Sequence, residues 1–259
     1  ALSANTSADN NTAVGFQALE VNTTGANNVA VGSLSLTSNS TGAQNVAVGR
    51  EALDANTTAN NNSAVGDSAL GSNTTGANNT SLGAAALFSN TTASNNTAVG
   101  KDALQLNTTG TQNTSVGALS LDANTTGSQN TACGEGALSK NTTASNNVGI
   151  GFQALVENTT GSECTAVGTN ALDANTTATN NTAVGYLALT STQTGASNTA
   201  VGRSSLANNT ASNNTAVGNS AMLANTTGTA NTAMGAEALD ANTTGNFNDA
   251  FGKGALSAN

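Results

Sequence analysis

Hydrophobic and polar residues recur along this chain with a period of 17 residues. Each repeat closes with a segment close to Asn-Thr-Ala-Val-Gly, and its Gly defines repeat position 17. The full repeat reads x-x-A-L-x-x-N-T-T-(G/A)-x-x-N-T-A-V-G. The closing glycines are Gly15, Gly32, Gly49, Gly66, Gly83, Gly100, Gly117, Gly134, Gly151, Gly168, Gly185, Gly202, Gly218, Gly235 and Gly252. The interval from Gly202 to Gly218 is 16 residues, and we expect the missing residue between Leu206 and Asn209.

Two repeat positions carry the large apolar residues. Position 4 is Leu in every repeat except at Met222, and position 16 is usually Val. Alternation along a strand places positions 14 and 16 on one face and positions 13, 15 and 17 on the other. We therefore expect Leu and Val to point inward. The expected core residues are Leu19, Val31, Leu53, Val65, Leu104, Val116, Leu155 and Val167.

Position 15 is nearly always Ala, and the same alternation predicts that it points outward. A flat outer face of small residues suits close packing against another chain. A simple steric preference for a tight coil explains the Ala residues equally well.

The length of the repeat indicates the fold. Helical-hairpin repeats need about 33 residues or more, whereas 17 residues suit one coil of a β-solenoid. The sequence therefore predicts an all-β protein, a parallel β-solenoid (β-roll) of about fifteen 17-residue coils in one continuous array over residues 1–259. Because the terminal repeats show no capping sequence, we expect the array to belong to a longer fibre or to stack end to end.

Asn at positions 7 and 13 and Gly at position 17 are nearly invariant along the chain. Asn is a poor strand former, but it tolerates turn dihedrals, including left-handed ones, and its amides can form a ladder between stacked coils. An invariant Gly indicates a corner that needs positive φ or leaves no room for Cβ. The expected corner and ladder residues are Asn22, Asn28, Gly32, Asn56, Asn62 and Gly66.

The Asn-Thr-Thr segment also matches the acceptor pattern for N-linked glycans. Candidate glycan-bearing residues are Asn22, Asn56, Asn73 and Asn107. Glycans on successive coils about 4.8 Å apart would crowd severely, so a structural role for these Asn residues is favoured.

Composition narrows the function classes. Charged residues make up 7% of the chain and aromatic residues 2%, and the absence of His removes the commonest general base and metal ligand. The Asp residues are scattered, so we expect a non-enzymatic protein with no metal array and no cofactor. A net charge of −9 argues against nucleic acid as a partner, and no apolar run is long enough for membrane insertion.

The charges themselves follow the repeat. All charged residues except Asp249 lie at the variable positions 1, 2, 5, 6, 11 and 12, which we expect to face water or a partner.

Cys133 replaces a Val at position 16 and Cys164 replaces an Asn at position 13. They lie about two coils apart, so we predict no disulfide between them. Cys133 is expected to be a small buried hydrophobic residue.

The motif Ala-Val-Gly-x-x-Ala occurs at Ala13–Ala18 and again at Ala183–Ala188. Its regular recurrence resembles the head repeats of YadA-like trimeric autotransporter adhesins and the Asn-Thr-Ala-Val-Gly arrays of phage-like tail-fibre proteins. The resemblance covers essentially the whole chain and implies a trimer of left-handed parallel β-rolls on a surface-exposed adhesin. The present repeat differs in being longer, with an added Asn-Thr-Thr-Gly segment.

These observations favour a structural role in an extracellular fibre or in the shaft or head of an adhesin, at a cell surface, in a secreted filament or on a virion. The expected partners are copies of the chain itself, as a lateral trimer or an end-to-end filament, together with a host-surface or glycan ligand. Ice binding by files of Thr at positions 8 and 9 is the alternative. Neighbouring strand residues point to opposite faces, so each face would carry one Thr file.

Overall fold

A computed structural model describes residues 1–257 of the chain. Within these residues it contains fifteen β-strands of three residues each and no helix. The strands are β1 (Thr12–Val14), β2 (Val29–Val31), β3 (Val46–Val48), β4 (Ser63–Val65), β5 (Thr80–Leu82), β6 (Thr97–Val99), β7 (Thr114–Val116), β8 (Thr131–Cys133), β9 (Val148–Ile150), β10 (Thr165–Val167), β11 (Thr182–Val184), β12 (Thr199–Val201), β13 (Thr215–Val217), β14 (Thr232–Met234) and β15 (Asp249–Phe251). The predicted all-β solenoid with a coil of about 17 residues is confirmed.

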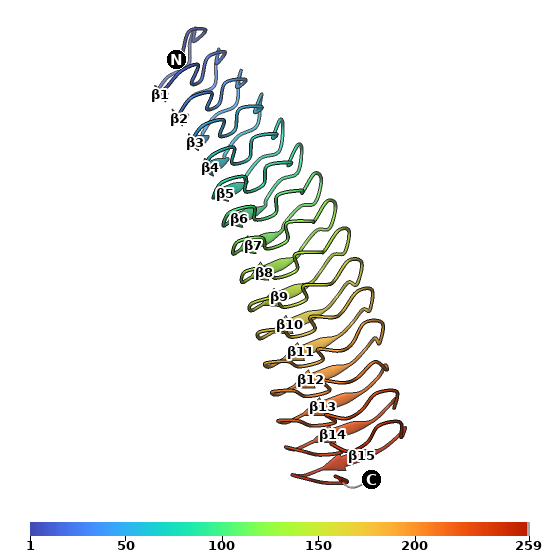
Figure 1. Cartoon of the computed structure of the whole chain (residues 1–259). Helices are drawn as coiled ribbons and strands as arrows, with labels where there is room; N and C mark the ends of the chain where they lie inside the picture. Colours follow the sequence, from blue (N-terminus) through green and yellow to red (C-terminus); the bar gives the residue numbers. More distant parts are fainter. Residues whose placement is uncertain (258–259) are drawn as a thin grey trace. The chain divides into compact units, whose positions relative to one another are not determined.

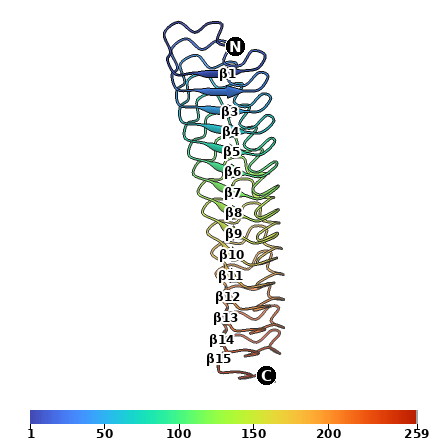
Figure 2. The same cartoon turned by 90° about the vertical axis from the view of Figure 1, so that its left-hand side faces the viewer.

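The chain divides into two compact units, Ala1–Gln129 with β1–β7 and Asn130–Asn259 with β8–β15. Within each unit the strands follow one another in chain order, one strand to a coil (Figures 1 and 2). Neighbouring strands pair in parallel, so that equivalent residues of successive coils lie side by side, as Ala13 does with Ala30. The prediction of one array over the whole chain stays a prediction.

The glycine at position 17 ends each strand with a sharp change of direction. Its φ lies between 113° and 141° in all fifteen repeats, a region that is open mainly to glycine. At Gly32 (φ 137°), an added Cβ would also lie 2.3 Å from the carbonyl oxygen of Gly49 in the next coil. Both reasons expected for an invariant glycine therefore apply, and Gly66 (φ 138°) repeats the arrangement.

Left-handed backbone conformations are also frequent at positions 2, 4 and 12, where the residues are mostly not glycine. Asn27 at position 12 has φ 61° and Leu19 at position 4 has φ 50°. The left-handed conformation considered for Asn at positions 7 and 13 is not found, since Asn22 and Asn28 do not have positive φ. A left-handed Leu costs about 1–2 kcal/mol, and in this fold it lies in the tight turn that directs the side chain inward.

The interior of each coil is narrow and is built from a few small side chains around one Leu. Leu at position 4 and Ala at positions 3 and 15 are fully buried, as Leu19, Ala18 and Ala30 show. The core prediction is therefore confirmed for Leu19, Leu53, Leu104 and Leu155. Stability accumulates coil by coil, because each Leu packs against its neighbours along the stack.

The predicted direction of positions 15 and 16 is wrong. Val31 and Val167 are half-buried, Val65 and Val116 are 37% exposed, and these four residues lie on the outer face of their strands. Position 15 points inward instead, and there is little room beyond a methyl group. At Gly149, which occupies position 15, an added Cβ would lie 3.2 Å from Cγ of Leu138. The predicted flat outer face of Ala does not exist.

The short repeat adapts at a different place from the one expected. Leu206 and Asn209 keep the spacing of positions 4 and 7, and the Asn209 backbone N–H donates to the Leu206 carbonyl oxygen (3.1 Å) as in the regular coils. The residue that is missing is the second Thr, between Thr210 and Ala211. Thr210 still donates to Thr226 in the next coil (2.9 Å), so the loss is absorbed within one turn.

Truncation of an inward-facing residue should lower the free energy of unfolding much more than truncation of an outward-facing residue in the same unit. Leu87→Ala leaves a cavity in the narrow core and should lower the free energy of unfolding by about 2–5 kcal/mol. Val99→Ala removes an outward side chain and should cost about 1 kcal/mol or less. Urea denaturation followed by circular dichroism at low protein concentration measures both. Equal losses would show that position 16 belongs to the core after all.

Candidate functional site

Asn residues at position 7 form a buried ladder through the interior. Nδ2 of Asn39 donates to Oδ1 of Asn22 in the preceding coil (3.0 Å) and to the carbonyl oxygen of Gly42 in its own coil (2.9 Å). Asn56 repeats the pattern on Asn39 (2.8 Å). Each amide thus links two coils and fixes a turn within one, which keeps the buried amides paired.

A second buried ladder runs through position 13. Oδ1 of Asn28 accepts from the backbone N–H of Asn45 in the next coil (2.9 Å). Nδ2 of Asn28 donates to the carbonyl oxygen of Gly42, also in the next coil (2.8 Å). Asn62 makes the equivalent bonds to Asn79 (2.9 Å) and Gly76 (2.8 Å). The predicted ladder role of Asn22, Asn28, Asn56 and Asn62 is confirmed.

The ladder at position 7 also bears on whether its Asn residues can carry N-linked glycans. Asn22, Asn56, Asn73 and Asn107 are fully buried, and Nδ2 of each already donates to backbone or side-chain oxygens. N-linked sugars need an accessible side-chain nitrogen. These four residues are therefore not glycan sites in the folded chain, and the candidate assignment is wrong.

One coil interrupts the position-7 ladder. Thr192 stands where other coils have Asn, and its hydroxyl donates to the backbone carbonyl oxygen of Asn209 (2.7 Å). Oδ1 of Asn175 in the preceding coil is consequently buried without a hydrogen-bond partner. A buried acceptor that has lost its partner typically costs about 1–3 kcal/mol. This coil is a weak point of the C-terminal unit.

The two cysteines are free thiols with different surroundings. Cys164 is buried at position 13, where its backbone N–H still donates to Oδ1 of Asn147 (2.9 Å). Burial raises the pKa of the Cys164 thiol above its ordinary value. Cys133 is exposed, which corrects the expectation of a buried residue, because its position 16 faces outward.

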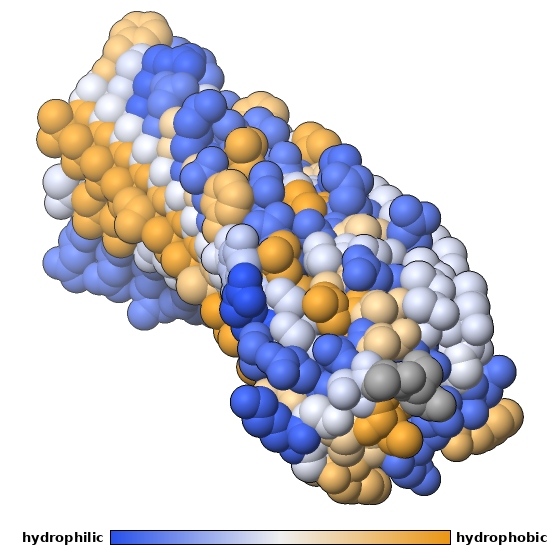
Figure 3. Space-filling model, turned by 60° about the horizontal axis from the view of Figure 1, so that its bottom comes forward, coloured by the Kyte–Doolittle hydropathy of each residue, from blue (hydrophilic) through white to orange (hydrophobic). Residues whose placement is uncertain are grey.

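Positions 14 and 16 together form the outer face of the strands, which we call the strand face. Position 16 contributes a row of apolar side chains, with Val14 58%, Leu82 47% and Met234 44% exposed. Position 14 contributes mostly Thr, with Val29 and Val46 among the replacements. Hydrophobic side chains gather in a row along one side of the space-filling view (Figure 3). A row of exposed apolar side chains along a unit is unusual on a monomer surface.

Charge is nearly excluded from the strand face. Positions 14 and 16 carry no charged residue in the N-terminal unit, and Asp249 is the only one among the described residues of the C-terminal unit. The charged side chains lie at the variable positions instead, where they are exposed or half-buried. This exposure agrees with the expectation that the charged positions face water or a partner.

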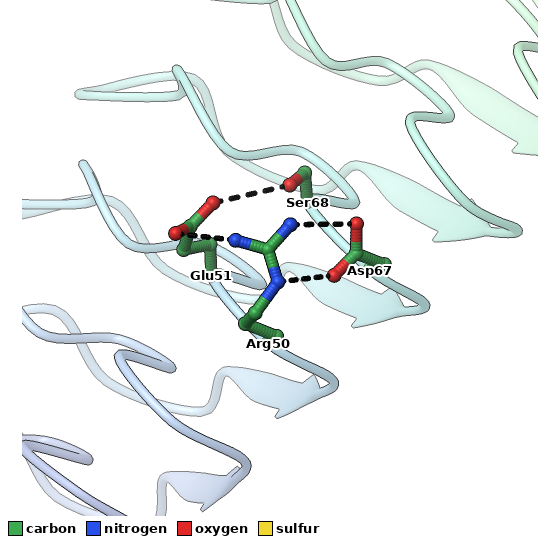
Figure 4. A network of polar contacts seen from close by, with 4 residues as sticks. All are labelled: Arg50, Glu51, Asp67 and Ser68. Carbon is green, nitrogen blue, oxygen red and sulfur yellow. Dashed lines mark hydrogen bonds and ion pairs between the residues drawn. The ribbon is translucent and has the colours of Figure 1, made fainter.

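Some of these charges pair between successive coils. Nε of Arg50 lies 2.8 Å from Oδ1 of Asp67 in the next coil, and its NH1 lies 2.6 Å from Oε1 of Glu51 (Figure 4). The hydroxyl of Ser68 donates to Oε2 of Glu51 (3.4 Å). Lys140 pairs with Glu157 in the same way in the C-terminal unit (2.7 Å). Exposed pairs of this kind contribute little stability, typically below about 1 kcal/mol.

Within residues 1–257, no group of three or more His, Cys, Asp or Glu side chains is arranged to hold a metal ion. The same residues include no helix long and apolar enough to span a membrane. No known family model matches the chain, and no curated protein sequence matches it either. The resemblance to adhesin heads and tail-fibre arrays therefore stays a prediction from the motif.

Repair of the interrupted ladder should stabilise the protein. Thr192→Asn restores a donor to Oδ1 of Asn175, and we expect the free energy of unfolding to rise by about 1–3 kcal/mol. Asn158→Thr is the matched control, because it creates the same break two coils earlier, where Asn158 donates to Oδ1 of Asn141, and it should lower stability by a similar amount. Urea denaturation of the two variants and the parent chain makes the comparison. No gain from Thr192→Asn would show that the ladder bonds contribute nothing to stability.

Proposed function

We propose that this chain is a structural, non-enzymatic module that associates with copies of itself through the strand face, in the shaft or head of an extracellular fibre or adhesin. The observation that carries the proposal is the strand face itself, an apolar and almost uncharged row on a chain with a net charge of −9. Copies that met through the variable positions would bring carboxylates together. Copies that meet through the strand face keep these charges in water.

The periodicity of the strand face favours a second copy as the partner. Equivalent residues repeat at the spacing of stacked strands, about 4.8 Å. A second copy has the same spacing, so a contact made at one coil recurs at each of the following coils. An unrelated globular partner would match only a few of them. The contact free energy of a copy therefore grows with the number of coils that are in register.

The rest of the coil suits a load-bearing role. Parallel backbone pairing joins successive strands within each unit, and the two Asn ladders join successive coils in the interior. Pulling two coils apart would break all of these hydrogen bonds together. A lateral trimer or an end-to-end filament at a cell surface, in a secreted filament or on a virion is the context that the motif resemblance suggests.

Ice binding remains a second candidate, and the strand face is the observation that favours it. Thr and Val at positions 14 and 16 make two parallel outward files where the sequence predicted none. The Thr-Thr segment at positions 8 and 9 offers a smaller surface for ice binding. Thr23 at position 8 donates its hydroxyl to the Ser40 carbonyl oxygen (3.0 Å), which leaves one exposed file, at position 9. Thermal hysteresis at micromolar protein would favour ice binding over the fibre.

Charges placed on the strand face should abolish association. We expect Val48→Asp/Val99→Asp to remain monomeric in sedimentation velocity at concentrations where the parent chain forms oligomers, because each Asp would be desolvated in the contact. Ala84→Asp/Ala118→Asp is the matched control: it adds the same two charges at position 1, where both residues are exposed and where Asp67 stands in another coil. It should associate like the parent chain.

Cys133 gives a second readout of the same contact, since it lies exposed on the strand face. Association should slow its alkylation, and the double Asp variant should restore the fast rate. Cys164 should react slowly in both, because burial protects the thiol and raises its pKa. A parent chain that stays monomeric at all concentrations, or an Asp variant that still associates, would contradict the proposed contact.

A further inference from the structure

A pocket opens on the side of the N-terminal unit where three successive coils carry Asp54, Gly71 and Phe88 at position 5. Its volume is about 320 Å³, and Glu51, Ala55, Ser68 and Ser72 complete the lining. Gly71 creates the space, because it places no side chain between the carboxylate before it and the ring after it. It is the only glycine at position 5 in the sequence.

The walls of the pocket differ in chemistry. An added Cβ on Gly71 would lie 3.3 Å from Oδ1 of Asp54 and 3.3 Å from Cε2 of Phe88, so both side chains border the gap directly. Phe88 is 40% exposed and offers an apolar surface to anything that enters. Ser68 and Ser72 add hydroxyl groups. An aromatic surface opposite a carboxylate and hydroxyls is the combination that orients a ligand with one apolar and one polar edge.

The two carboxylates of the pocket are not equivalent. Glu51 is held by Arg50 at 2.6 Å and by the Ser68 hydroxyl at 3.4 Å, with Arg50 also bound to Asp67 (Figure 4). Among residues 1–257, no cation forms an ion pair with Asp54. Burial, and then the charge of Glu51, raise the pKa of Asp54, while backbone N–H groups of Ala55 and Asp54 itself act in the opposite direction. Asp54 is thus the carboxylate that remains available to accept hydrogen bonds from a ligand.

We propose that this pocket binds a neutral sugar ring, with the C–H face of the ring on Phe88 and its hydroxyls donating to the Asp54 carboxylate and exchanging hydrogen bonds with Ser72. The volume lies at the small end of ligand pockets, which fits a single saccharide residue. Glu51 and Asp54 disfavour acidic sugars by like-charge repulsion. The proposal goes beyond association through the strand face and does not depend on it, because no residue of the pocket lies at position 14 or 16.

Saturation-transfer NMR on the whole chain tests the proposal with defined probes. The probes are methyl β-D-glucopyranoside, methyl β-D-galactopyranoside and methyl α-D-mannopyranoside, with methyl β-D-glucuronide as the acidic comparison and n-butylammonium as a cation. We expect at least one neutral glycoside to bind with about millimolar affinity, through its ring C–H protons. The glucuronide should give a much weaker signal.

Two variants locate the binding. Gly71→Thr fills the gap with a residue that Thr37 and Thr190 already supply at position 5, and Phe88→Ala removes an exposed ring; each should reduce the signal to background. Ser139→Thr makes a comparable change at position 5 in the C-terminal unit and should leave the signal unchanged. Circular dichroism checks that each variant folds. If Gly71→Thr does not fold, the signal of Phe88→Ala alone tests whether the glycoside binds in this pocket.

Three results would overturn the proposal: no signal from any neutral glycoside, an undiminished signal in Phe88→Ala, or binding of n-butylammonium without a glycoside. Sedimentation of the same samples reports association separately. A chain that associates but binds no glycoside would remove the sugar site and leave the fibre proposal intact.

Discussion

Hydrogen bonding by buried Asn side chains is the interaction on which this fold depends. A coil of 17 residues encloses too little space for two rows of large apolar side chains, and Leu at position 4 already occupies much of it. Asn fills the remainder because the neighbouring coil supplies partners for its amide, as Asn22 does for Asn39. A polar interior of this kind is stable only when it is nearly fully paired, so the same residue must recur at the same position. The near-invariance of the repeat follows from this requirement.

The requirement for buried, paired Asn side chains also determines which residues lie on the outer surface. With Asn at position 13 and Ala at position 15 inside, alternation along the strand must turn positions 14 and 16 outward. Within each unit, Thr and Val therefore form an extended face that is apolar and almost free of charge. Sites that differ from coil to coil lie elsewhere, at variable positions such as position 5. The fold thus separates a repeated surface, suited to copies of itself, from a variable surface on which a single pocket can arise.

Much of the fold was predictable because every coil repeats the evidence. The period, the parallel β-solenoid, the Leu core, the glycine corners and the Asn ladders all follow from residues that recur many times. The direction in which the strand side chains point was not predictable in this way, because their hydrophobicity suggested that Val31 and Val65 were core residues. The decisive fact was that Asn28 points inward, and composition favours placing Asn at a corner. Assignment of Asn28 to the interior would have placed Ala30 inside and Val31 outside.

The pocket was beyond sequence reasoning for a different reason. It depends on one absent side chain, Gly71, between two unlike neighbours in adjacent coils. Phe88 and Asp54 look like scattered variants until the coil spacing brings them together. The broken ladder at Thr192 was predictable only in part. The substitution is visible in the sequence. That it leaves Oδ1 of Asn175 unpaired is evident only from the structure, in which position-7 Asn residues donate to the preceding coil.

Hydrogen–deuterium exchange of the Asn side-chain amides, resolved by NMR, tests the central claim most directly. If the ladders hold the coils together, the Nδ2 protons at positions 7 and 13 should exchange as slowly as the paired backbone N–H groups of the same coils. Exposed Asn side chains at position 12, such as Asn61 and Asn95, should exchange at once. Rapid exchange at Asn56 and Asn62, with the strands intact, would contradict the account.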